Sequence, residues 1–245
     1  MKKYKKRKKV VKMTYWAVSD MHGYYSFYEQ VKTIIAPEDK VICLGDCGDR
    51  GPQSWKTIKA VLSDPQFIYL KGNHEDMLAK ALYQYFEQDF IDRDYYYLCS
   101  MNGGSMTFYD ASCESDPLGV AKVLNNLPIE YQYTNPKGDR ICLCHAGFTG
   151  GRTWKEPKRK EHDFIWDRDH TFDPASCFDT TNFDVVVHGH TPIPFDFVDN
   201  DEFDGKAHFY CGDHKINIDA GSYHSHMGIL FNLDTFDSIT IKLTD

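Results

Sequence analysis

Five short segments rich in aspartate, histidine and asparagine each follow an apolar run of the sequence. They read SDMHG at 19–23, GDCGDRG at 45–51, KGNHE at 71–75, HAG at 145–147 and HGHT at 188–191. Ligands of α/β proteins bind where the strands end at their carboxyl edge, so we expect the five segments to meet at one place. Carboxylate, imidazole and amide groups without a thiolate suit Mn, Fe or Zn better than Ca or a structural zinc–cysteine site.

Six of these side chains have the chemistry of metal ligands. Asp20 and His22 are two residues apart, and side chains two apart on a strand point to the same face, so both can reach one ion. The two carboxylate oxygens of Asp46 can bridge two ions. The other candidates are Asn73, His145 and His190. Two ions about 3.5–4 Å apart activate a water molecule and hold the oxygens of an in-line displacement.

Asp49 and Arg50 lie beside this set and have no obvious ion to bind. A guanidinium matches the geometry of a phosphate, and a neighbouring carboxylate can orient a catalytic group. The pattern therefore indicates chemistry on a phosphate ester.

Alternating strands and helices are expected to position these segments. The first half predicts strands at 14–19, 41–44 and 67–70 and helices at 24–35, 53–62 and 74–86. Such repetition by itself favours an α/β layer built on largely parallel strands. Residues 87–128 are expected to be helical. Further strands are predicted at 129–133, 140–144, 183–187, 207–210, 215–218, 227–233 and 238–243, and their short turns favour antiparallel pairing near the C-terminus.

Taken in order, these motifs resemble a known family. The sequence contains Asp20-x-His22, Gly45-Asp46-x-x-Asp49-Arg50-Gly51, Gly72-Asn73-His74-Glu75, His145-Ala146 and Gly189-His190-Thr191. Three less specific matches are Asn102-Gly103-Gly104, Ile165-Trp166-Asp167-Arg168 and Ile218-Asp219-Ala220-Gly221. This order and spacing, over roughly residues 14–233, resembles the serine/threonine protein phosphatases of the calcineurin-like metallophosphoesterase superfamily. The compact bacterial and phage branch is the most similar.

The resemblance implies an α/β fold, with a central β-sandwich of mixed sheets flanked by helices in place of a simple parallel sheet. It also implies two divalent metal ions, with manganese expected and iron or zinc as alternatives. One ion would be held by Asp20, His22 and Asp46, and the other by Asp46, Asn73, His145 and His190. By the same resemblance, His74 is a general acid oriented by Asp49, and Arg50 and Arg168 bind phosphate.

The expected function is hydrolysis of phosphoserine and phosphothreonine in proteins, by in-line attack of a metal-bridged hydroxide. The alternative is a symmetrical dinucleoside tetraphosphate hydrolase built on the same metal site. Relatives of that kind usually lack the Asp-Arg pair and the Asn-His-Glu motif that this sequence has at 49–50 and 73–75. The presence of both motifs favours phosphoproteins or small phosphoesters as substrates. A catalytically inactive interaction module is a third alternative, and the complete ligand set with His74 argues against it.

Several nearby residues have simpler explanations. Arg168 is flanked by aspartates and is also explained as a surface residue. Glu75 is expected to cap or pair at the start of a helix rather than to take part in the chemistry. His188 is expected to support the site or belong to a strand. Strand alternation places Cys142 and Cys144 on the face opposite His145, so we expect them to pack in the core.

Charge is distributed unevenly along the 245 residues. Eight of the 28 basic residues lie at positions 1–12, which leaves 20 basic and 36 acidic side chains, a net charge of −16, in residues 13–245. We therefore expect residues 1–12 to form a disordered basic tail with an undetermined partner, and residues 13–245 to form one catalytic domain. A domain this acidic repels a phosphate backbone, which argues against nucleic acid as its partner.

The eight cysteines are too sparse for a secreted disulfide framework, and three of them lie in apolar runs. No export signal follows the basic tail, and no apolar stretch is long enough for a membrane helix. We therefore expect reduced thiols and a cytoplasmic protein.

Overall fold

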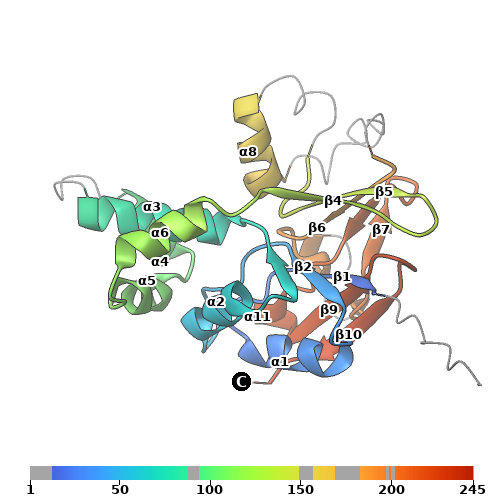
Figure 1. The fold of residues 1–245 in the computed structure, drawn as a ribbon, viewed down its shortest axis with the longest axis horizontal. Helices are drawn as coiled ribbons and strands as arrows, with labels where there is room; N and C mark the ends of the chain where they lie inside the picture. Colours follow the sequence, from blue (N-terminus) through green and yellow to red (C-terminus); the bar gives the residue numbers. More distant parts are fainter. Residues whose placement is uncertain are drawn as a thin grey trace, which may run out of the picture.

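The computed structural model describes residues 13–87, 94–148, 157–168, 183–196, 199 and 202–244. The expected basic tail, residues 1–12, lies outside the described residues. The elements form two β-sheets, with helices on both sides (Figure 1).

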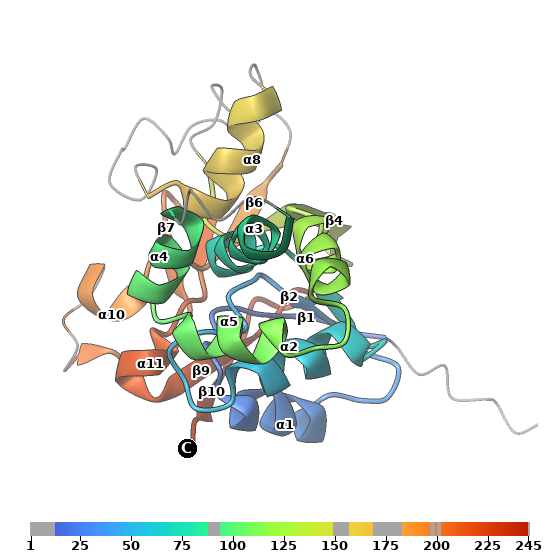
Figure 2. The same ribbon diagram turned by 90° about the vertical axis from the view of Figure 1, so that its left-hand side faces the viewer.

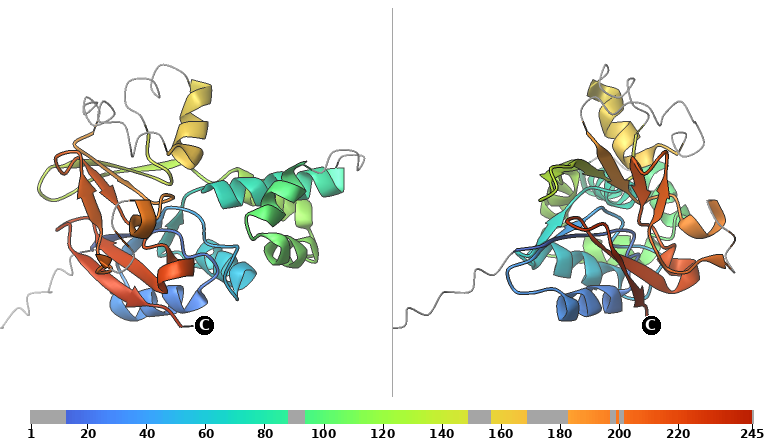
Figure 3. Two further views of the ribbon diagram at one scale, coloured as in Figure 1. Left: turned by 180° about the vertical axis from the view of Figure 1, so that it is seen from behind. Right: turned by 90° about the vertical axis from the view of Figure 1, so that its right-hand side faces the viewer.

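The first sheet has the strand order β10-β9-β1-β2-β3. Its strands are β1 (Tyr15–Val18), β2 (Lys40–Cys43), β3 (Phe67–Tyr69), β9 (Met227–Asn232) and β10 (Ser238–Lys242). The first three pair in parallel, whereas β9 pairs antiparallel to both β1 and β10. The C-terminal strands thus lie beside the N-terminal one, and Figure 3 shows them on the side away from helices α3 to α6.

The second sheet has the order β4-β5-β6-β8-β7. Its strands are β4 (Glu130–Thr134), β5 (Arg140–Cys144), β6 (Val185–His188), β7 (His208–Tyr210) and β8 (Lys215–Asn217). The central strands β5, β6 and β8 are parallel, and the two edge strands are antiparallel to their neighbours.

Helices follow the first three strands at the positions that hydrophobic periodicity predicts. They are α1 (Tyr25–Ile34), α2 (Ser54–Ser63) and α3 (Asn73–Glu87). The aromatic-rich middle of the chain is helical, as expected: α4 (Asp94–Met101), α5 (Ser105–Ser112) and α6 (Pro117–Asn125). The later helices are α8 (Pro157–Trp166), α10 (Ile193–Asp196) and α11 (Ser222–Ser225). In Figure 2, α3, α4, α5 and α6 form a group, and α8 lies above it.

Three apolar clusters define the layers. One contains Ala17, Ile42, Ile141 and Val187, residues from both sheets, so the two sheets pack face to face. A second packs the other face of the first sheet against α1 to α6, and a third packs α8 on the outer face of the second sheet. The β-sandwich implied by the resemblance is therefore confirmed. The simple parallel sheet that strand–helix repetition favours is wrong, because local periodicity does not reveal which strands pair.

The cysteines differ in part from expectation. Cys142 and Cys144 are fully buried and pack with Phe148 and Phe164, as predicted. Of the cysteines in the described part of the chain, six are free thiols and Cys211 is disulfide-bonded, so the expectation of reduced thiols fails at that position. Among the described residues, the structure has no helix long and apolar enough to span a membrane.

Candidate metal centre

Two groups of buried side chains could each hold a metal ion. One contains His22, Asp46 and His74, and the other contains Asp46, His145 and His190. Within each group the ligand atoms lie within 4.8 Å of one another. Because Asp46 belongs to both groups, the two positions share one carboxylate, which is the arrangement expected for a bridging ligand.

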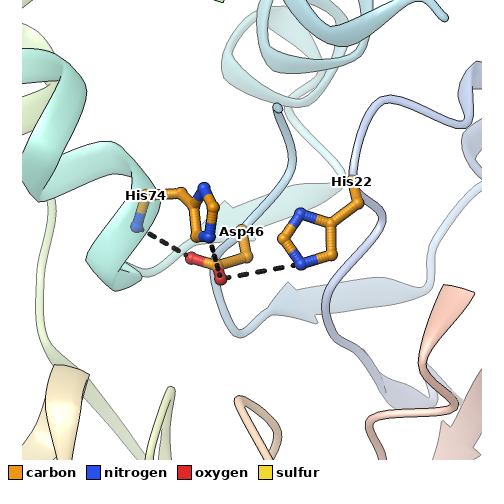
Figure 4. Close-up of side chains that lie close together, drawn as sticks. All are labelled: His22, Asp46 and His74. Carbon is orange, nitrogen blue, oxygen red and sulfur yellow. Dashed lines mark hydrogen bonds and ion pairs between the residues drawn. The ribbon is translucent and has the colours of Figure 1, made fainter. Parts of the chain in front are cut away.

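The two oxygens of Asp46 face different groups. Its Oδ2 atom lies 3.8 Å from Nε2 of His22 and 3.7 Å from Nε2 of His74 (Figure 4). Its Oδ1 atom lies 3.4 Å from Nε2 of His145 and accepts a hydrogen bond from the His74 amide. The carboxylate therefore extends between the two candidate ion positions.

Hydrogen bonds with main-chain carbonyls orient two of the imidazoles. Nδ1 of His22 donates to the carbonyl of Gly48 at 3.0 Å, and Nδ1 of His145 donates to that of Leu44 at 2.9 Å. This leaves Nε2 of each ring facing Asp46, and a carbonyl-bonded Nδ1 is the usual support of a metal-binding histidine. Nε2 of His190 is buried and has no hydrogen-bond partner. A buried nitrogen lone pair without a partner is costly, so it fits a metal ligand.

Asp20 and Asn73 complete the predicted set. Oδ1 of Asp20 lies 3.8 Å from Nε2 of His22, and its Oδ2 accepts a hydrogen bond from the amide of His190. Oδ1 of Asn73 lies 2.9 Å from Nε2 of His145. The structure thus brings all six predicted ligand residues together, although they extend over 171 positions of the chain.

The backbone explains how they converge. Among the described residues, ten non-glycine residues have a positive φ, and six of them belong to the predicted site: Asp20, His22, Asp46, Asp49, Arg50 and His190. Non-glycine residues rarely adopt this left-handed conformation, and such strain clusters at functional sites. The expectation that strand alternation aligns Asp20 with His22 is therefore wrong. Both residues follow β1, and a left-handed backbone directs their side chains to the site.

The charges of the site favour a cation. Burial lowers the pKa of His145, but the negative charge of Asp46 outweighs burial and raises that pKa to about 10. Burial and the adjacent positive charge of Arg50 lower the pKa of His22 well below its usual range. Burial likewise lowers the pKa of His190, and the positive charge of His145 lowers it further. His22 and His190 are thus kept neutral, as metal ligands must be, whereas His145 holds a proton that a bound metal ion would displace.

A second cluster adjoins the ligands. Nδ1 of His74 lies 2.6 Å from Oδ2 of Asp49, both side chains being buried. Arg50 donates from Nη1 to Nε2 of His22 and from Nη2 to Nε2 of His74, at 2.7 and 3.0 Å. Burial lowers the pKa of His74, but the charge of Asp46 and the contact with Asp49 outweigh it and raise that pKa.

These groups line a polar cavity of about 200 Å³. Its walls include five of the six predicted ligands, His145 excepted, together with Arg50 and His74. The other lining residues are Asn102, Trp166 and Arg168. Arg168 is exposed and donates to Oγ1 of Thr191 at 3.3 Å, so the structure places its guanidinium at the cavity.

Glu75 has a larger structural role than the sequence indicates. Its Oε2 atom accepts hydrogen bonds from the amides of Asp46 and Gly72, both at 2.8 Å. Its Oε1 atom accepts from the Cys47 amide and the Tyr69 hydroxyl, at 3.0 and 2.6 Å. Glu75 therefore fixes the backbone of the Asp46 loop as well as the start of α3. The sequence signal for a structural role of Glu75 is its position directly after His74, at the start of the predicted helix.

His188 is the last residue of β6, is fully buried and does not line the cavity. Its Nδ1 atom donates to the carbonyl of Gly189, and its Nε2 atom lies 2.7 Å from the hydroxyl of Tyr210. The prediction that it belongs to a strand is confirmed.

The sequence is similar to curated proteins of two named activities. It is 26% identical to serine/threonine-protein phosphatase 2 of Escherichia coli over 156 residues, which cover 62% of this chain and 66% of that protein. It is 24% identical to the asymmetrical bis(5′-nucleosyl)-tetraphosphatase PrpE of Oceanobacillus iheyensis, over 74% of this chain and 69% of that protein.

Solved structures share the fold. A protein serine/threonine phosphatase from Saccharomyces cerevisiae superposes with a TM-score of 0.58 at 13% identity, over 95% of this chain and 80% of that one. A crystal structure described as that of a “putative diadenosine tetraphosphatase” superposes with a TM-score of 0.54 at 15% identity, over 95% of this chain and 94% of that one. The family model for calcineurin-like phosphoesterases matches residues 13–194. The chain is therefore a member of the calcineurin-like phosphoesterase family, with the mixed two-sheet fold and the buried aspartate–histidine groups described above.

Proposed function

We propose that this phosphoesterase is a metal-dependent phosphomonoesterase that acts on phosphoserine and phosphothreonine in proteins. The observation that supports it most is the contact of His74 with Asp49, next to Arg50 and Asp46 in one small cavity. This arrangement supports a role for His74 as proton donor, for Arg50 as phosphate-binding cation and for Asp46 as shared metal ligand.

Each residue of the site has a separate role in the proposed reaction. Divalent ions, manganese in our proposal, would be held by Asp20, His22 and Asp46 at one position and by Asp46, Asn73, His145 and His190 at the other. They would supply Lewis acidity and lower the pKa of water. Arg50 and Arg168 would hold the phosphate oxygens, since a guanidinium binds phosphate in a fixed geometry. Asp49 holds Nδ1 of His74, and Asp46 and Asp49 favour the protonated ring. Once Arg50 turns from Nε2 of His74 to the phosphate, that nitrogen would be free to deliver a proton to the departing alkoxide.

His74→Asn tests this assignment with two substrates. The alkoxide leaving from phosphoserine is strongly basic and needs a proton, whereas a nitrophenolate hardly does. We expect kcat on a phosphoserine peptide to fall by about 10²–10⁴-fold, the usual contribution of general acid catalysis, with a clearly smaller loss on p-nitrophenyl phosphate. Metal analysis should still find two ions per chain. Equal losses on both substrates with intact metal would instead assign His74 to charge stabilisation, and lost metal would contradict our ligand set.

Hydrolysis of dinucleoside tetraphosphates is the second candidate, because one curated relative carries that name. A parallel turnover assay with Mn²⁺ on a phosphopeptide, diadenosine tetraphosphate and a 2′,3′-cyclic nucleotide separates the two. We expect the phosphopeptide to be the best substrate by kcat/KM. Comparable or faster turnover of diadenosine tetraphosphate would contradict the phosphoprotein assignment.

A further inference from the structure

A second cavity, of about 400 Å³, adjoins the 200 Å³ cavity of the candidate metal centre, which we call the metal cavity. It lies among α3, α6 and α8, and Trp166, the last residue of α8, lines both cavities. Figure 2 shows α8 above α3 and α6. The metal cavity is only half as large, so it accommodates a phosphoryl group and little else. The remainder of a substrate must therefore lie outside it, and Trp166 marks one direction in which it can extend.

The charges of this second cavity are already balanced. Nζ of Lys80 lies 2.7 Å from Oδ2 of Asp76, and Nζ of the buried Lys71 lies 2.8 Å from Oε1 of Glu161. Of these four residues, Asp76, Glu161 and Lys80 line the cavity, so its walls carry two carboxylates and one ammonium. A further phosphate would bring negative charge against both carboxylates. The cavity therefore does not suit the second half of a nucleoside polyphosphate.

The remaining lining suits a polypeptide. Asn125 and His162 are exposed and offer hydrogen-bonding groups for main-chain amides, while Ile165 and Trp166 form an apolar wall for a side chain. A peptide needs this combination, because each residue presents amide groups and one side chain.

We propose that the second cavity binds the polypeptide on one side of the phosphorylated residue, with Trp166 between this segment and the phosphoryl group. The inference rests on the proposed phosphoprotein activity and adds the part of the enzyme that selects the substrate.

The test compares the wild type with the double variant Asn125→Ala, His162→Ala, both loaded with Mn²⁺. Phosphoserine peptides are lengthened residue by residue on either side. For the wild type, we expect KM to fall about 3–10-fold as residues are added on one side only, the gain that one or two hydrogen bonds provide. The double variant should lose most of this gain, while kcat and KM for p-nitrophenyl phosphate, which does not reach the second cavity, stay unchanged. Asn126→Ala, a change at an exposed neighbour that lines neither cavity, is the matched control and should behave as the wild type.

Each other outcome overturns one defined statement. If the double variant keeps the full gain in KM, the second cavity is not the peptide site, although the phosphatase activity stands. If instead KM rises for diadenosine tetraphosphate but not for peptides, the cavity binds a nucleoside and the inference is wrong. If the wild type hydrolyses no phosphopeptide at all, the proposed function itself fails.

Discussion

At the scale of single residues, the centre depends on Asp46. Its two oxygens contact different histidines, and its amide is held by Glu75. Burial raises the pKa of this carboxyl group, but the positive charges of His145 and His74 outweigh it and hold the pKa well below its usual range. The carboxylate therefore stays charged and able to contact two cations.

Asp46→Asn should be the most damaging change of a single ligand, because it removes negative charge from both ion positions. We expect fewer than two ions per chain by elemental analysis and a loss of turnover of at least about 10²-fold, comparable to the loss of a principal electrostatic contact. Chelation should abolish wild-type activity, and Mn²⁺ should restore it. Asp110→Asn, at an exposed position of α5, is the control. Activity that survives exhaustive chelation would contradict a metal-dependent reaction.

Glu75→Gln should loosen the Asp46 loop without removing any ligand. Two of the four donors around Glu75 would then face an amide NH₂ group rather than an oxygen. We expect a loss of about 2–4 kcal/mol in the free energy of unfolding, measured with urea, since unsatisfied buried groups cost about 1–3 kcal/mol each. A fall in kcat should accompany it. Glu87→Gln, an exposed change on the same helix, should alter neither quantity, and unchanged stability of the Glu75 variant would show that this network is dispensable.

At the scale of elements, loops from both sheets meet with very little free space. The loops after β1 and β2 are joined by hydrogen bonds from the amides of His22 and Gly23 to the carbonyls of Asp46 and Cys47. Within the second sheet, the amide of Gly189 donates to the carbonyl of His145, and across the sandwich the amide of His190 donates to Oδ2 of Asp20. Such close backbone contacts require glycine, and Gly72 is the clearest case. A Cβ atom at Gly72 would lie 2.2 Å from Oδ1 of Asp46.

Gly72→Ala should therefore displace Asp46. The added methyl group would also lie 2.7 Å from the Asp46 amide and 2.8 Å from Oε2 of Glu75, so the backbone must shift. We expect reduced metal content and a loss of about 1–3 kcal/mol in stability, typical of an overpacked site. Gly138→Ala is the informative control. Its φ of +97° makes alanine strained, but no atom lies within 4 Å, so stability should fall while metal content and kcat stay unchanged. Full metal content in Gly72→Ala would show that the loop can adapt.

At the scale of the whole molecule, residues 1–12 are strongly basic, whereas the candidate site residues belong to an acidic segment. Residues 13–245 carry a net charge of −16, yet the metal cavity presents two arginines, Arg50 and Arg168. Under the proposed function, an anionic substrate would meet these two guanidiniums on an acidic protein, so we expect phosphate to be recognised by specific side chains rather than by long-range attraction.

Removal of residues 1–12 should leave kcat on p-nitrophenyl phosphate within about twofold of the full chain, because a terminal segment with eight basic residues has little apolar surface to contribute to a core. The melting temperature should also stay the same. The steady-state assay should use equal metal loading of both proteins. A large loss of turnover with the shortened chain would make the tail part of the catalytic domain.

The sequence alone determined which residues are candidate ligands, their order and most of the elements. Periodicity predicted α3 at 74–86, and it forms at Asn73–Glu87; the strand predicted at 140–144 forms at Arg140–Cys144. These features depend on neighbours in the chain, because the period of apolar residues sets which local structure buries them.

Only the tertiary structure decided how the ligands meet. The contact of Asp20 with the amide of His190 joins residues 170 positions apart, and it exists because the two sheets pack face to face. The left-handed backbone of the ligand loops and the four donors around Glu75 likewise arise from packing between distant segments. Local sequence patterns do not specify such contacts, since a polar residue after a strand has the same pattern whether it caps a turn or faces a metal.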